Sequence, residues 1–411
     1  MPSDEQPPRR RPRLTPSIAD VRRAVRSVLP DVSAATVPTA ATVPTDAAVP
    51  TDATVPTAAA VPTDAAVPTD AAVLTDAAVP TDAATPAASA PREAPAASAP
   101  LVLVALSGGA DSLALAAATA FEAPRAGLRA GAVIVDHGLQ ERSAEVAAAA
   151  ATQARELGLD PVLVRRVKVT GEGGPEAAAR TARYAALEAA AAETDAALVL
   201  LGHTLDDQAE TVLLGLARGS GAASLAGMAA RTRRFARPLL GIRRETTRQA
   251  CTDAGLTPWD DPHNVDRGYS RVRVRERVLP VLEAELGPGI AEALARTAEQ
   301  LREDDEAFSE QIEEFIEEIC EPAEAGIAVS VGALTANPAA LRQRIIRHVV
   351  LSEFDVSLTR AQTIEVARLV TDWHGQGPID LPAGIRVTRH HGRVEFQNSG
   401  TNTSEFRNPP A

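Results

Sequence analysis

The chain has 411 residues, a formal net charge of −13, and a composition that is 45% hydrophobic but only 3% aromatic. This length suits two to three domains, and an alanine-rich, aromatic-poor core favours helices packed on a sheet. The chain holds a single lysine, Lys168, which lies between two valines, and this excludes a Walker A phosphate loop ending in Gly-Lys-Ser/Thr.

The N-terminal arm, residues 1–34, starts with a polar, arginine-rich stretch and lacks the apolar segment of a signal peptide. No stretch of the chain reaches the roughly 18 unbroken apolar residues of a membrane span, so we expect a cytoplasmic protein without membrane contact. Residues 16–32 predict a short amphipathic helix, because the apolar residues from Ile18 to Val28 recur at helical spacing.

A hexapeptide of the form Ala-(Ala/Thr)-Val-Pro-Thr-(Asp/Ala) follows in eight copies, from Ala35 to Asp82. Proline recurs at every sixth position in seven of the eight copies, with Leu74 in its place in the other, and prevents a regular helix; large apolar side chains are too few to offset the ordering entropy. A β-helix is the alternative for this period, but these recurring prolines argue against its strands. We predict a disordered linker over residues 35–99, with repeat slippage and no function as its simplest origin.

Apolar runs and helical stretches alternate over residues 100–240. The expected strands are 101–106, 132–136, 161–169 and 197–202, and the expected helices begin at Asp111 and cover 141–157, 175–193 and 205–217. This alternation predicts an α/β domain with a doubly wound parallel sheet. Right-handed crossovers then bring the carboxyl ends of the strands to one edge of the sheet, where ligands bind.

Two further units are expected beyond this domain. Residues 241–325 predict a helical extension, with helices over 271–286 and 288–320. Residues 326–398 predict a small α+β domain with helices near 338–353 and 359–371 and strands at 378–381, 385–389 and 393–396. Residues 399–411 are expected to form a disordered tail.

The string Ser-Gly-Gly-Ala-Asp-Ser at residues 107–112 follows the first predicted strand and opens a helix. Its glycines let the backbone turn tightly and approach a phosphate, and the N–H groups at a helix N-terminus attract anionic oxygens. Ser107 and Ser112 add hydroxyls, and the Asp111 carboxylate can hold Mg²⁺ against phosphates. A capped helix start after a glycine turn is the alternative. The full string at a strand–helix junction favours the phosphate site.

A second motif, Gly-His-Thr-Leu-Asp-Asp-Gln-Ala-Glu-Thr at residues 202–211, follows another predicted strand. Asp207 and Glu210 are three residues apart, so their carboxylates share one face of the helix. Acidic residues in a first helical turn also interact with the helix dipole, which is the alternative explanation. The expected sheet topology places this pair on the same edge as residues 107–112.

The first motif is similar to the signature of the PP-loop ATP pyrophosphatase family, which cleaves ATP between its α and β phosphates. The resemblance implies that six residues wrap the pyrophosphate part of ATP: Ser107, Gly108, Gly109, Ala110, Asp111 and Ser112. It also implies that Asp136 and His137 lie near the adenosine, with a simple strand-ending turn as the alternative. His203 is a further residue expected at the ATP site.

Both motifs together resemble the tRNA(Ile)-lysidine synthetase family, strongly over residues 101–290 and more loosely towards the C-terminus. The resemblance implies a ligase that uses ATP and Mg²⁺ to adenylate the wobble cytidine of the isoleucine tRNA with a CAU anticodon. Free L-lysine then displaces AMP and forms lysidine. In this scheme Asp207 and Glu210 hold the lysine α-amino group or accept a proton from the attacking amine, and Arg183 and Arg275 stabilise charge on phosphate or RNA. A homodimer is left open.

Further stretches fit this family: 179–180, 183–184, 218–221, 237–240, 261–264, 269–280 and 381–387. Two positions depart from it. His263 stands where the family usually has Ser or Thr, and Val272 where it usually has Asn, and both lie in the segment expected to face RNA or ATP. The repeat is a third departure, and none of the three changes the phosphate loop.

Charge is unevenly distributed along the chain. Residues 218–277 hold 13 arginines against 6 acidic residues, whereas residues 283–324 hold 15 acidic residues against 2 arginines. The arginines expected to contact RNA phosphates are Arg231, Arg233, Arg234, Arg237, Arg243, Arg244, Arg248, Arg267, Arg271, Arg273, Arg275 and Arg277. Any single one of them has a solvated surface as its alternative. Because aromatic residues are scarce there, recognition should depend on phosphates and shape.

Other function classes fit the sequence less well. A PP-loop tRNA thiolase needs catalytic or cluster-binding cysteines, whereas the chain has only Cys251 and Cys320, which form no CxxC pair and are expected to be inert. GMP and asparagine synthetases need an amidotransferase or a dimerisation module. A non-catalytic nucleotide-binding module would explain neither the second acidic motif nor the basic stretch.

Overall fold

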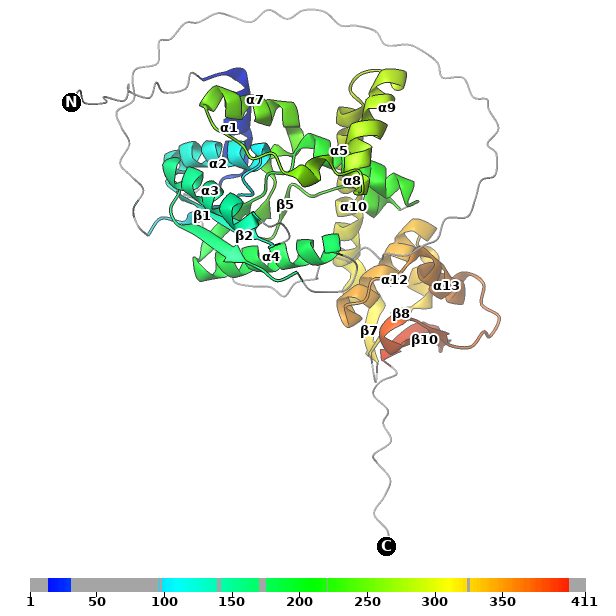
Figure 1. Ribbon diagram of the computed structural model, residues 1–411. Helices are drawn as coiled ribbons and strands as arrows, with labels where there is room; N and C mark the ends of the chain where they lie inside the picture. Colours follow the sequence, from blue (N-terminus) through cyan, green and yellow to red (C-terminus); the bar gives the residue numbers. More distant parts are fainter. Residues whose placement is uncertain are drawn as a thin grey trace, which may run out of the picture.

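A computed structural model describes residues 14–30, 96, 98–138, 142–169, 175–219, 221–323 and 326–398. These residues form an α/β domain, a helical extension and a smaller C-terminal unit (Figure 1). Apart from residues 96, 98 and 99, the predicted linker lies outside the described residues, and so does the predicted tail. Among the described helices, none has the length and apolar character needed to cross a membrane.

The α/β domain is built on a six-stranded sheet with the strand order β3-β2-β1-β4-β6-β5. The strands are β1 (Leu101–Ala105), β2 (Arg129–Asp136), β3 (Val162–Arg166), β4 (Ala196–Leu200), β5 (Arg231–Thr232) and β6 (Phe235–Ala236). Every pair is parallel except β5–β6. The predicted parallel sheet is confirmed. The two-residue strands β5 and β6 were not predicted, because such short strands show no apolar pattern.

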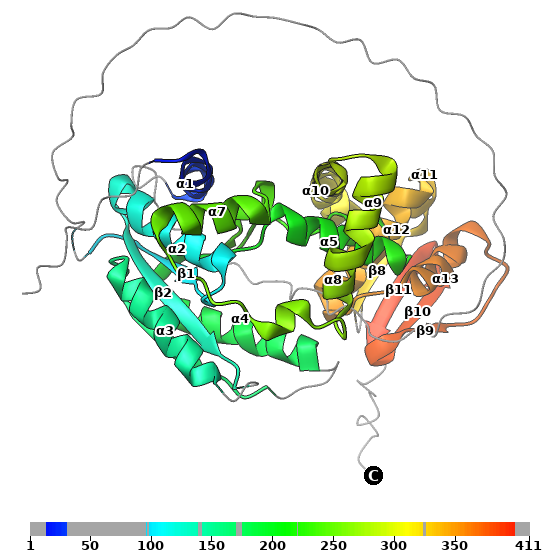
Figure 2. The same cartoon turned by 45° about the horizontal axis from the view of Figure 1, so that its top comes forward.

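Helices cover both faces of this sheet (Figure 2). On one face lie α1 (Pro16–Val28), α2 (Ala110–Glu122), α3 (Ser143–Glu156) and α7 (Arg244–Ala254), and on the other lies α4 (Pro175–Glu193). Strand β1 shows the alternation that this arrangement requires. Val102 and Val104 pack with the first set of helices, whereas Leu101 and Leu103 pack with α4. All four side chains are buried, so the strand reads as a continuous apolar run.

Helix α1 packs against α2 and α7 through Ile18, Val21 and Val25, all of which are buried. At its end, the Arg26 guanidinium donates two hydrogen bonds of 2.9 Å to the buried Glu122 carboxylate of α2. The helix ends at residue 28 instead of the predicted 32 because Pro30 disfavours helical backbone in the residue before it.

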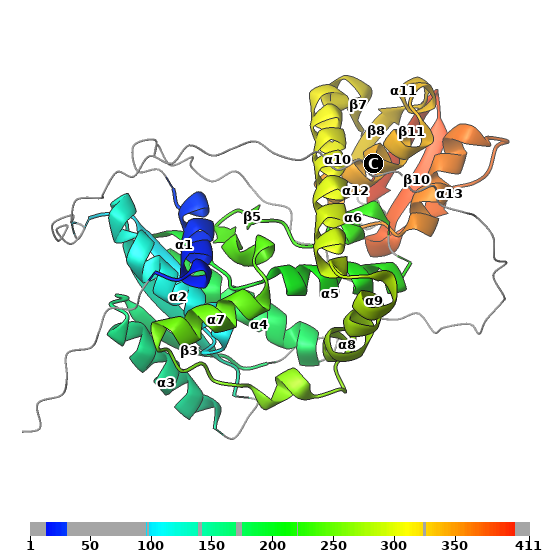
Figure 3. The ribbon, with the colours of Figure 1, turned by 90° about the horizontal axis from the view of Figure 1, so that it is seen from above.

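The helical extension connects the two units (Figure 3). Helix α5 (Leu205–Ala217) packs against the long helix α10 (Ile290–Ile319). The predicted helix over 271–286 is α8 (Ser270–Arg273), a π-helical segment (Val274–Val278) and α9 (Leu279–Leu286). Shorter helical segments are Pro124–Ala126, α6 (Ala222–Leu225), Pro238–Gly241, Pro262–Val265 and Pro382–Gly384.

The C-terminal unit has a five-stranded sheet with the strand order β7-β8-β11-β10-β9. Its elements are β7 (Cys320–Ala323), β8 (Gly326–Ser330), α11 (Val331–Ala336), α12 (Ala339–Phe354), α13 (Arg360–Thr371), β9 (Ile379–Asp380), β10 (Ile385–His390) and β11 (Arg393–Asn398). The sheet begins at Cys320, six residues before the expected boundary at 326. Strand β7 was not predicted because it is largely exposed and contains Pro322, which an edge strand tolerates.

Candidate active site

The two sequence motifs emerge side by side, because β1 and β4 are neighbours in the parallel sheet. Gly202, directly after β4, lies against the start of α2: a Cβ atom there would lie 3.1 Å from the Cα and N atoms of Ser112. This is tighter than most Cβ contacts, so a glycine favours the close approach of the two segments. The expectation that both motifs share one sheet edge is therefore confirmed.

The loop at residues 107–112 is held in shape by its own hydrogen bonds. The Ser112 hydroxyl accepts from the Ser107 N–H at 3.1 Å and donates to the Gly109 carbonyl at 3.0 Å. Gly108 has a φ of +88°, a left-handed conformation that favours glycine. No side chain caps the N-terminus of α2, so its first N–H groups and the helix dipole are left to attract an anion.

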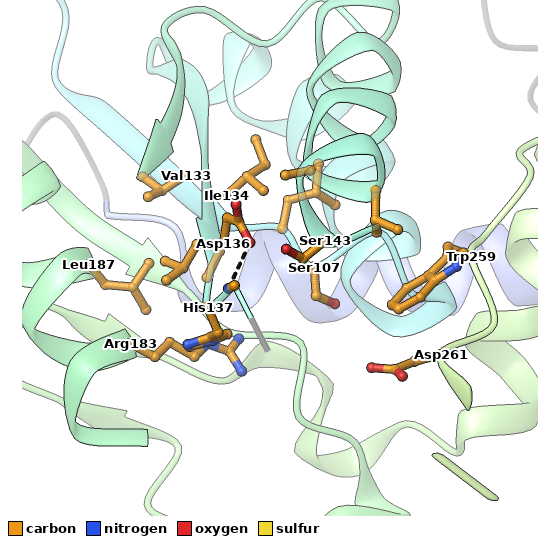
Figure 4. A pocket seen from close by; sticks show the side chains of 16 residues that line it. Ser107, Val133, Ile134, Asp136, His137, Ser143, Arg183, Leu187, Trp259 and Asp261 are labelled. Carbon is orange, nitrogen blue, oxygen red and sulfur yellow. Dashed lines mark hydrogen bonds between the residues drawn. The ribbon is translucent and has the colours of Figure 1, made fainter. Parts of the chain in front are cut away.

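A cavity of about 290 Å³ opens beside this loop (Figure 4). Its floor is the apolar end of β2, and Ser107 and Trp259 lie on its walls. Asp136 is buried in this cavity and accepts a hydrogen bond from the Gly138 N–H at 2.9 Å. The cavity thus joins an apolar surface suited to a base with a loop suited to phosphates.

Figure 4 also shows His137 and Arg183 together at one side of the cavity. The Nδ1 atom of His137 is buried and has no hydrogen-bond partner in the described part of the chain. Burial lowers the pKa of His137, and the Arg183 charge adds to this effect. Arg183 makes no hydrogen bond or ion pair with any described residue, and burial lowers its pKa. Such a guanidinium can stabilise a phosphate or an RNA oxygen.

His203 does not line this cavity; it follows β4, and its Nδ1 atom is also buried and without a partner among the described residues. Burial lowers the pKa of His203 to about 3, despite the opposing effect of Asp207. Its imidazole is therefore neutral at physiological pH. The structure does not bring it to the cavity beside the phosphate loop, so its expected contact with ATP stays a prediction.

The Asp207 carboxylate has a structural partner at the start of α5. Its Oδ2 atom accepts from both the N–H and the hydroxyl of Thr204 at 2.8 Å, which forms a capping box. Burial by itself would raise the pKa of Asp207, but Arg244 and the Thr204 N–H outweigh it and keep the carboxylate ionised. Asp207 thus has a structural role in capping the start of α5, in addition to the helix-dipole interaction named above as the alternative.

Arg244 joins the acidic residues of both motifs. Its Nη2 atom lies 2.7 Å from Asp207 Oδ1, its Nη1 atom 3.3 Å from Glu210 Oε1, and its Nε atom 3.6 Å from Asp111 Oδ2. The Glu210 carboxylate is fully buried. Burial alone would lower the pKa of Arg244, but these carboxylates raise it. The guanidinium is therefore a permanent cation between the phosphate loop and the acidic pair.

The sequence reasoning missed this role, since it assigned Arg244 to RNA contact. Arg244 begins α7, and the Thr247 hydroxyl one turn later donates to Asp111. Burial raises the pKa of Asp111, although the Thr247 hydroxyl and Arg244 both act against that. A signal was present: Arg244, Thr247 and Cys251 recur at helical spacing on the buried face of α7.

Arg275, in the π-helical segment, also contacts Glu210. Its Nε atom lies 2.7 Å from Glu210 Oε1 and its Nη2 atom 3.2 Å from Oε2. A π-helical turn often marks a functional position in a helix. Arg275 was expected to face phosphate or RNA, and the structure gives it a carboxylate partner instead. Glu210 thus lies between two arginines.

Other members of the arginine group also have structural partners, among them Arg237 and Arg243. Arg237 is buried and donates to the Ala229 carbonyl at 2.9 Å and to the Tyr184 hydroxyl at 3.2 Å. Arg243 lies 3.3 Å from both Asp206 and Glu292. The RNA expectation is therefore wrong for Arg237, which is buried, and for Arg244, whose guanidinium contacts three carboxylates. It remains a prediction for the exposed arginines Arg231, Arg233, Arg234, Arg248, Arg267, Arg273 and Arg277.

The described residues contain no group of three or more His, Cys, Asp or Glu side chains that could hold a metal ion. Mg²⁺ commonly binds through one or two carboxylates together with substrate phosphates. Asp111 fits that donor set, because its side chain is 24% exposed at the edge of the phosphate loop. Burial raises the thiol pKa of Cys251 to about 12 and of Cys320 to about 11, as expected for inert thiols.

In the comparison with known families, each of the two units matches a family model of its own. A model described as a PP-loop domain matches residues 86–282, and one described as a TilS substrate binding domain matches residues 330–395. Among solved structures, a U34-tRNA thiolase from Methanococcus maripaludis aligns at 20% identity with a TM-score of 0.43. That alignment covers 49% of this chain and 72% of the thiolase, and it supports no functional conclusion.

Three curated relatives carry the name tRNA(Ile)-lysidine synthase. The Leifsonia xyli protein is 64% identical over 74% of this chain and 92% of its own length. The Thermobifida fusca protein is 53% identical over 74% of this chain and 93% of its own length. The Streptomyces coelicolor protein is 53% identical over 72% of this chain and 85% of its own length.

The fold and the phosphate loop define a PP-loop enzyme that uses ATP. Within that class, the chain belongs to the tRNA(Ile)-lysidine synthase family, whose members are ATP-dependent ligases.

Proposed function

We propose that this enzyme joins free L-lysine to C2 of the wobble cytidine in the isoleucine tRNA with a CAU anticodon, in the cytoplasm. The observation that carries the proposal is the convergence of the phosphate loop and the acidic pair on Arg244. Two half-reactions on one tRNA base need an ATP site and an amine site within a few ångströms of each other. The sheet edge after β1 and β4 supplies both.

In the first half-reaction, the phosphates of ATP lie on residues 107–112, and the adenine base of ATP enters the cavity at the end of β2. The O2 atom of the cytidine forms a bond to the α phosphorus, and the bond to pyrophosphate breaks. Arg183 stabilises the charge that develops on the phosphate oxygens. Mg²⁺ bound by Asp111 would neutralise charge on the departing pyrophosphate.

In the second half-reaction, the lysine amine forms a bond to C2, and the C2–O2 bond breaks so that AMP leaves. The amine must be neutral to attack, so it first gives a proton to solvent water. Asp207 and Glu210 are the carboxylates expected to meet the amino acid, but both already accept from Arg244. We therefore propose that they hold the amino acid by sharing these oxygens with an ammonium group.

A second cavity, of about 150 Å³, supports this assignment. It is lined by Glu210 and by residues of both charges: Asp206, Arg243, Arg275 and Glu283. Free lysine carries two ammonium groups and one carboxylate at neutral pH. The acidic residues of this lining can pair with the ammonium groups, and its arginines with the carboxylate. Glu210 therefore lies between this cavity and Arg244.

The test is turnover of ATP, lysine and the isoleucine tRNA, followed by nucleoside analysis of the RNA. We expect lysidine, AMP and pyrophosphate in equal amounts. A transcript with uridine at the wobble position is the matched control and should give no lysidine. Pyrophosphate without lysidine would point to another PP-loop tRNA-modifying enzyme. No pyrophosphate at all would leave a nucleotide-binding module.

A further inference from the structure

Trp259 lies where the chain passes the phosphate loop after α7. Its backbone N–H donates to the Gly108 carbonyl at 2.9 Å. A Cβ atom built on Gly108 would lie 3.9 Å from the Trp259 Cβ atom. The main chain therefore fixes this residue against the loop, whatever side chain it carries. Trp259 also lies outside the motif strings on which the family resemblance depends.

The indole of Trp259 lines the 290 Å³ cavity. In Figure 4 it lies on the opposite side of Ser107 from His137 and Arg183. The cavity lining also includes the apolar residues Leu106, Ile134 and Ala147. A flat ring between a phosphate loop and an apolar slot is suited to the planar base of a nucleotide.

Several other rings in the described part of the chain have an aromatic or cationic partner. Tyr184 meets Phe235 edge to face, with the ring centroids 5.2 Å apart. Arg389 lies over Trp373 at 5.1 Å. Trp259 is half-buried, and its ring contacts neither an aromatic nor a cationic group among the described residues. Its face is therefore available to a ligand in the cavity.

We propose that Trp259 is a specificity-determining residue that stacks on the adenine base of ATP. This inference rests on the proposed function only in taking ATP as the nucleotide. Stacking of a base on an aromatic side chain contributes about 1–3 kcal/mol, which corresponds to roughly a 5- to 150-fold change in affinity.

Fluorescence tests the contact directly, because the chain has two tryptophans in separate units. In the Trp373→Phe variant, Trp259 is the sole indole. We expect a non-hydrolysable ATP analogue to change its emission and tripolyphosphate to leave it unchanged. In the Trp259→Phe variant, neither ligand should change the emission of Trp373. An equal response to tripolyphosphate, or no response to the ATP analogue, would overturn the proposal.

Kinetics of pyrophosphate release provide a second readout. Trp259→Ala should raise the KM for ATP about tenfold while leaving kcat and the KM for tRNA near their original values, and Trp259→Phe should restore most of the loss. Trp373→Ala is the matched control, and we expect it to leave the KM for ATP unchanged. A rise in the KM for tRNA instead would assign the ring to an RNA base and refute the proposal. If no variant releases pyrophosphate, the proposed function fails, while the fluorescence result still decides the stacking contact.

Discussion

Arg244 determines how three carboxylates coexist in a site with little access to water. Asp111, Asp207 and Glu210 would repel one another if each were ionised without a cation between them. A buried charge that loses its partner destabilises a fold much more than a lost surface pair does. The guanidinium therefore has two effects: it stabilises the domain, and it connects the residues expected to handle ATP with those expected to handle the amine.

Replacing Arg244 with alanine should lower the free energy of unfolding by about 3 kcal/mol or more, because its side chain is only 16% exposed and contacts three carboxylates. Arg248→Ala is the matched control on the same helix. Its side chain is 64% exposed and lies 4.0 Å from Asp260, so the change should stay within about 0.5 kcal/mol. Urea unfolding measures both. Equal losses in the two variants would show that the Arg244 network adds no stability.

Glu210→Gln should separate the two half-reactions. Pyrophosphate release with ATP and tRNA should persist, because Asp111 and residues 107–112 keep their contacts. Lysine incorporation should fall roughly ten- to a hundredfold, the loss expected for a charge-assisted contact of about 1.5–3 kcal/mol. Labelled lysine at several concentrations measures the second step. Glu245→Gln, at an exposed position of α7, is the control. An equal fall in pyrophosphate release would assign Glu210 to ATP or Mg²⁺.

His203 should make stability depend on pH. An unfolded histidine has a pKa of about 6.5, whereas burial lowers the pKa of His203 to about 3 in the folded state. Between these values the unfolded chain binds a proton that the folded chain does not. The contribution of neutral His203 to the free energy of unfolding is therefore fully present above pH 6.5. It is lost as the pH falls towards 3, by up to about 1.4 kcal/mol per pH unit.

Unfolding of the wild type and of His203→Gln between pH 7 and pH 5 measures this effect. The variant should lose the part of the slope that the buried histidine contributes. His374→Gln, at an exposed histidine of the C-terminal unit, is the control and should retain that slope. Identical slopes in wild type and His203→Gln would mean that His203 is as accessible to protons in the folded state as in the unfolded chain.

At the scale of elements, the apolar pattern of the sequence predicted the longer strands and helices of the α/β domain. Strands β1 to β4 and helices α2 to α5 were expected close to their observed bounds, because long apolar runs and helical spacing identify them. The pairs β5–β6 and β7–β8 were missed, since pairing with neighbouring strands defines them more than their own composition does. The location of Arg244 was missed for a related reason: a charged side chain is buried only where the fold supplies its partners.

Helix α1 shows that an element remote in sequence can be part of the ATP-binding domain. Arg26→Ala should lower the melting temperature by several degrees, because it leaves the Glu122 carboxylate, which is 2% exposed, without its paired donors. Arg23→Ala is the matched control: among the residues that the structure describes, Arg23 pairs with Asp20 alone, on the surface of the same helix. Arg26→Lys should recover part of the loss. If Arg26→Ala and Arg23→Ala melt alike, the cross-helix pair does not hold α1 in place.

At the scale of the whole molecule, α10 connects the active site to the C-terminal unit. Near its start it packs on α5, and Arg302 donates to the Met228 carbonyl at 2.7 Å. Near its end, Ile312 belongs to the core of the C-terminal unit. A single rigid helix thus determines the distance between the ATP site and the unit that matches a substrate-binding domain. Its many exposed acidic residues should keep RNA phosphates on the arginine-bearing surfaces.

The hexapeptide repeat is the part of the molecule that should matter least to this arrangement. It supplies neither a set of large apolar side chains nor a catalytic group, and loop length contributes only weakly to stability. Deleting residues 35–82 would leave 24 of the 72 residues between α1 and β1, which can extend over roughly 80 Å, more than twice the diameter of a small domain. Helix α1 could therefore still reach its site on α2 and α7.

We expect the deletion to change the melting temperature by no more than a degree or two and to leave lysine incorporation within about twofold of the full chain. Thermal unfolding and labelled-lysine turnover measure the two effects. The informative control combines the deletion with Arg26→Ala, which should melt as Arg26→Ala does in the full chain, because the two changes act at independent sites. A large loss in the deletion alone would show that the repeat takes part in folding or in tRNA binding. A loss seen only in the combined variant would mean that the long linker helps α1 to dock.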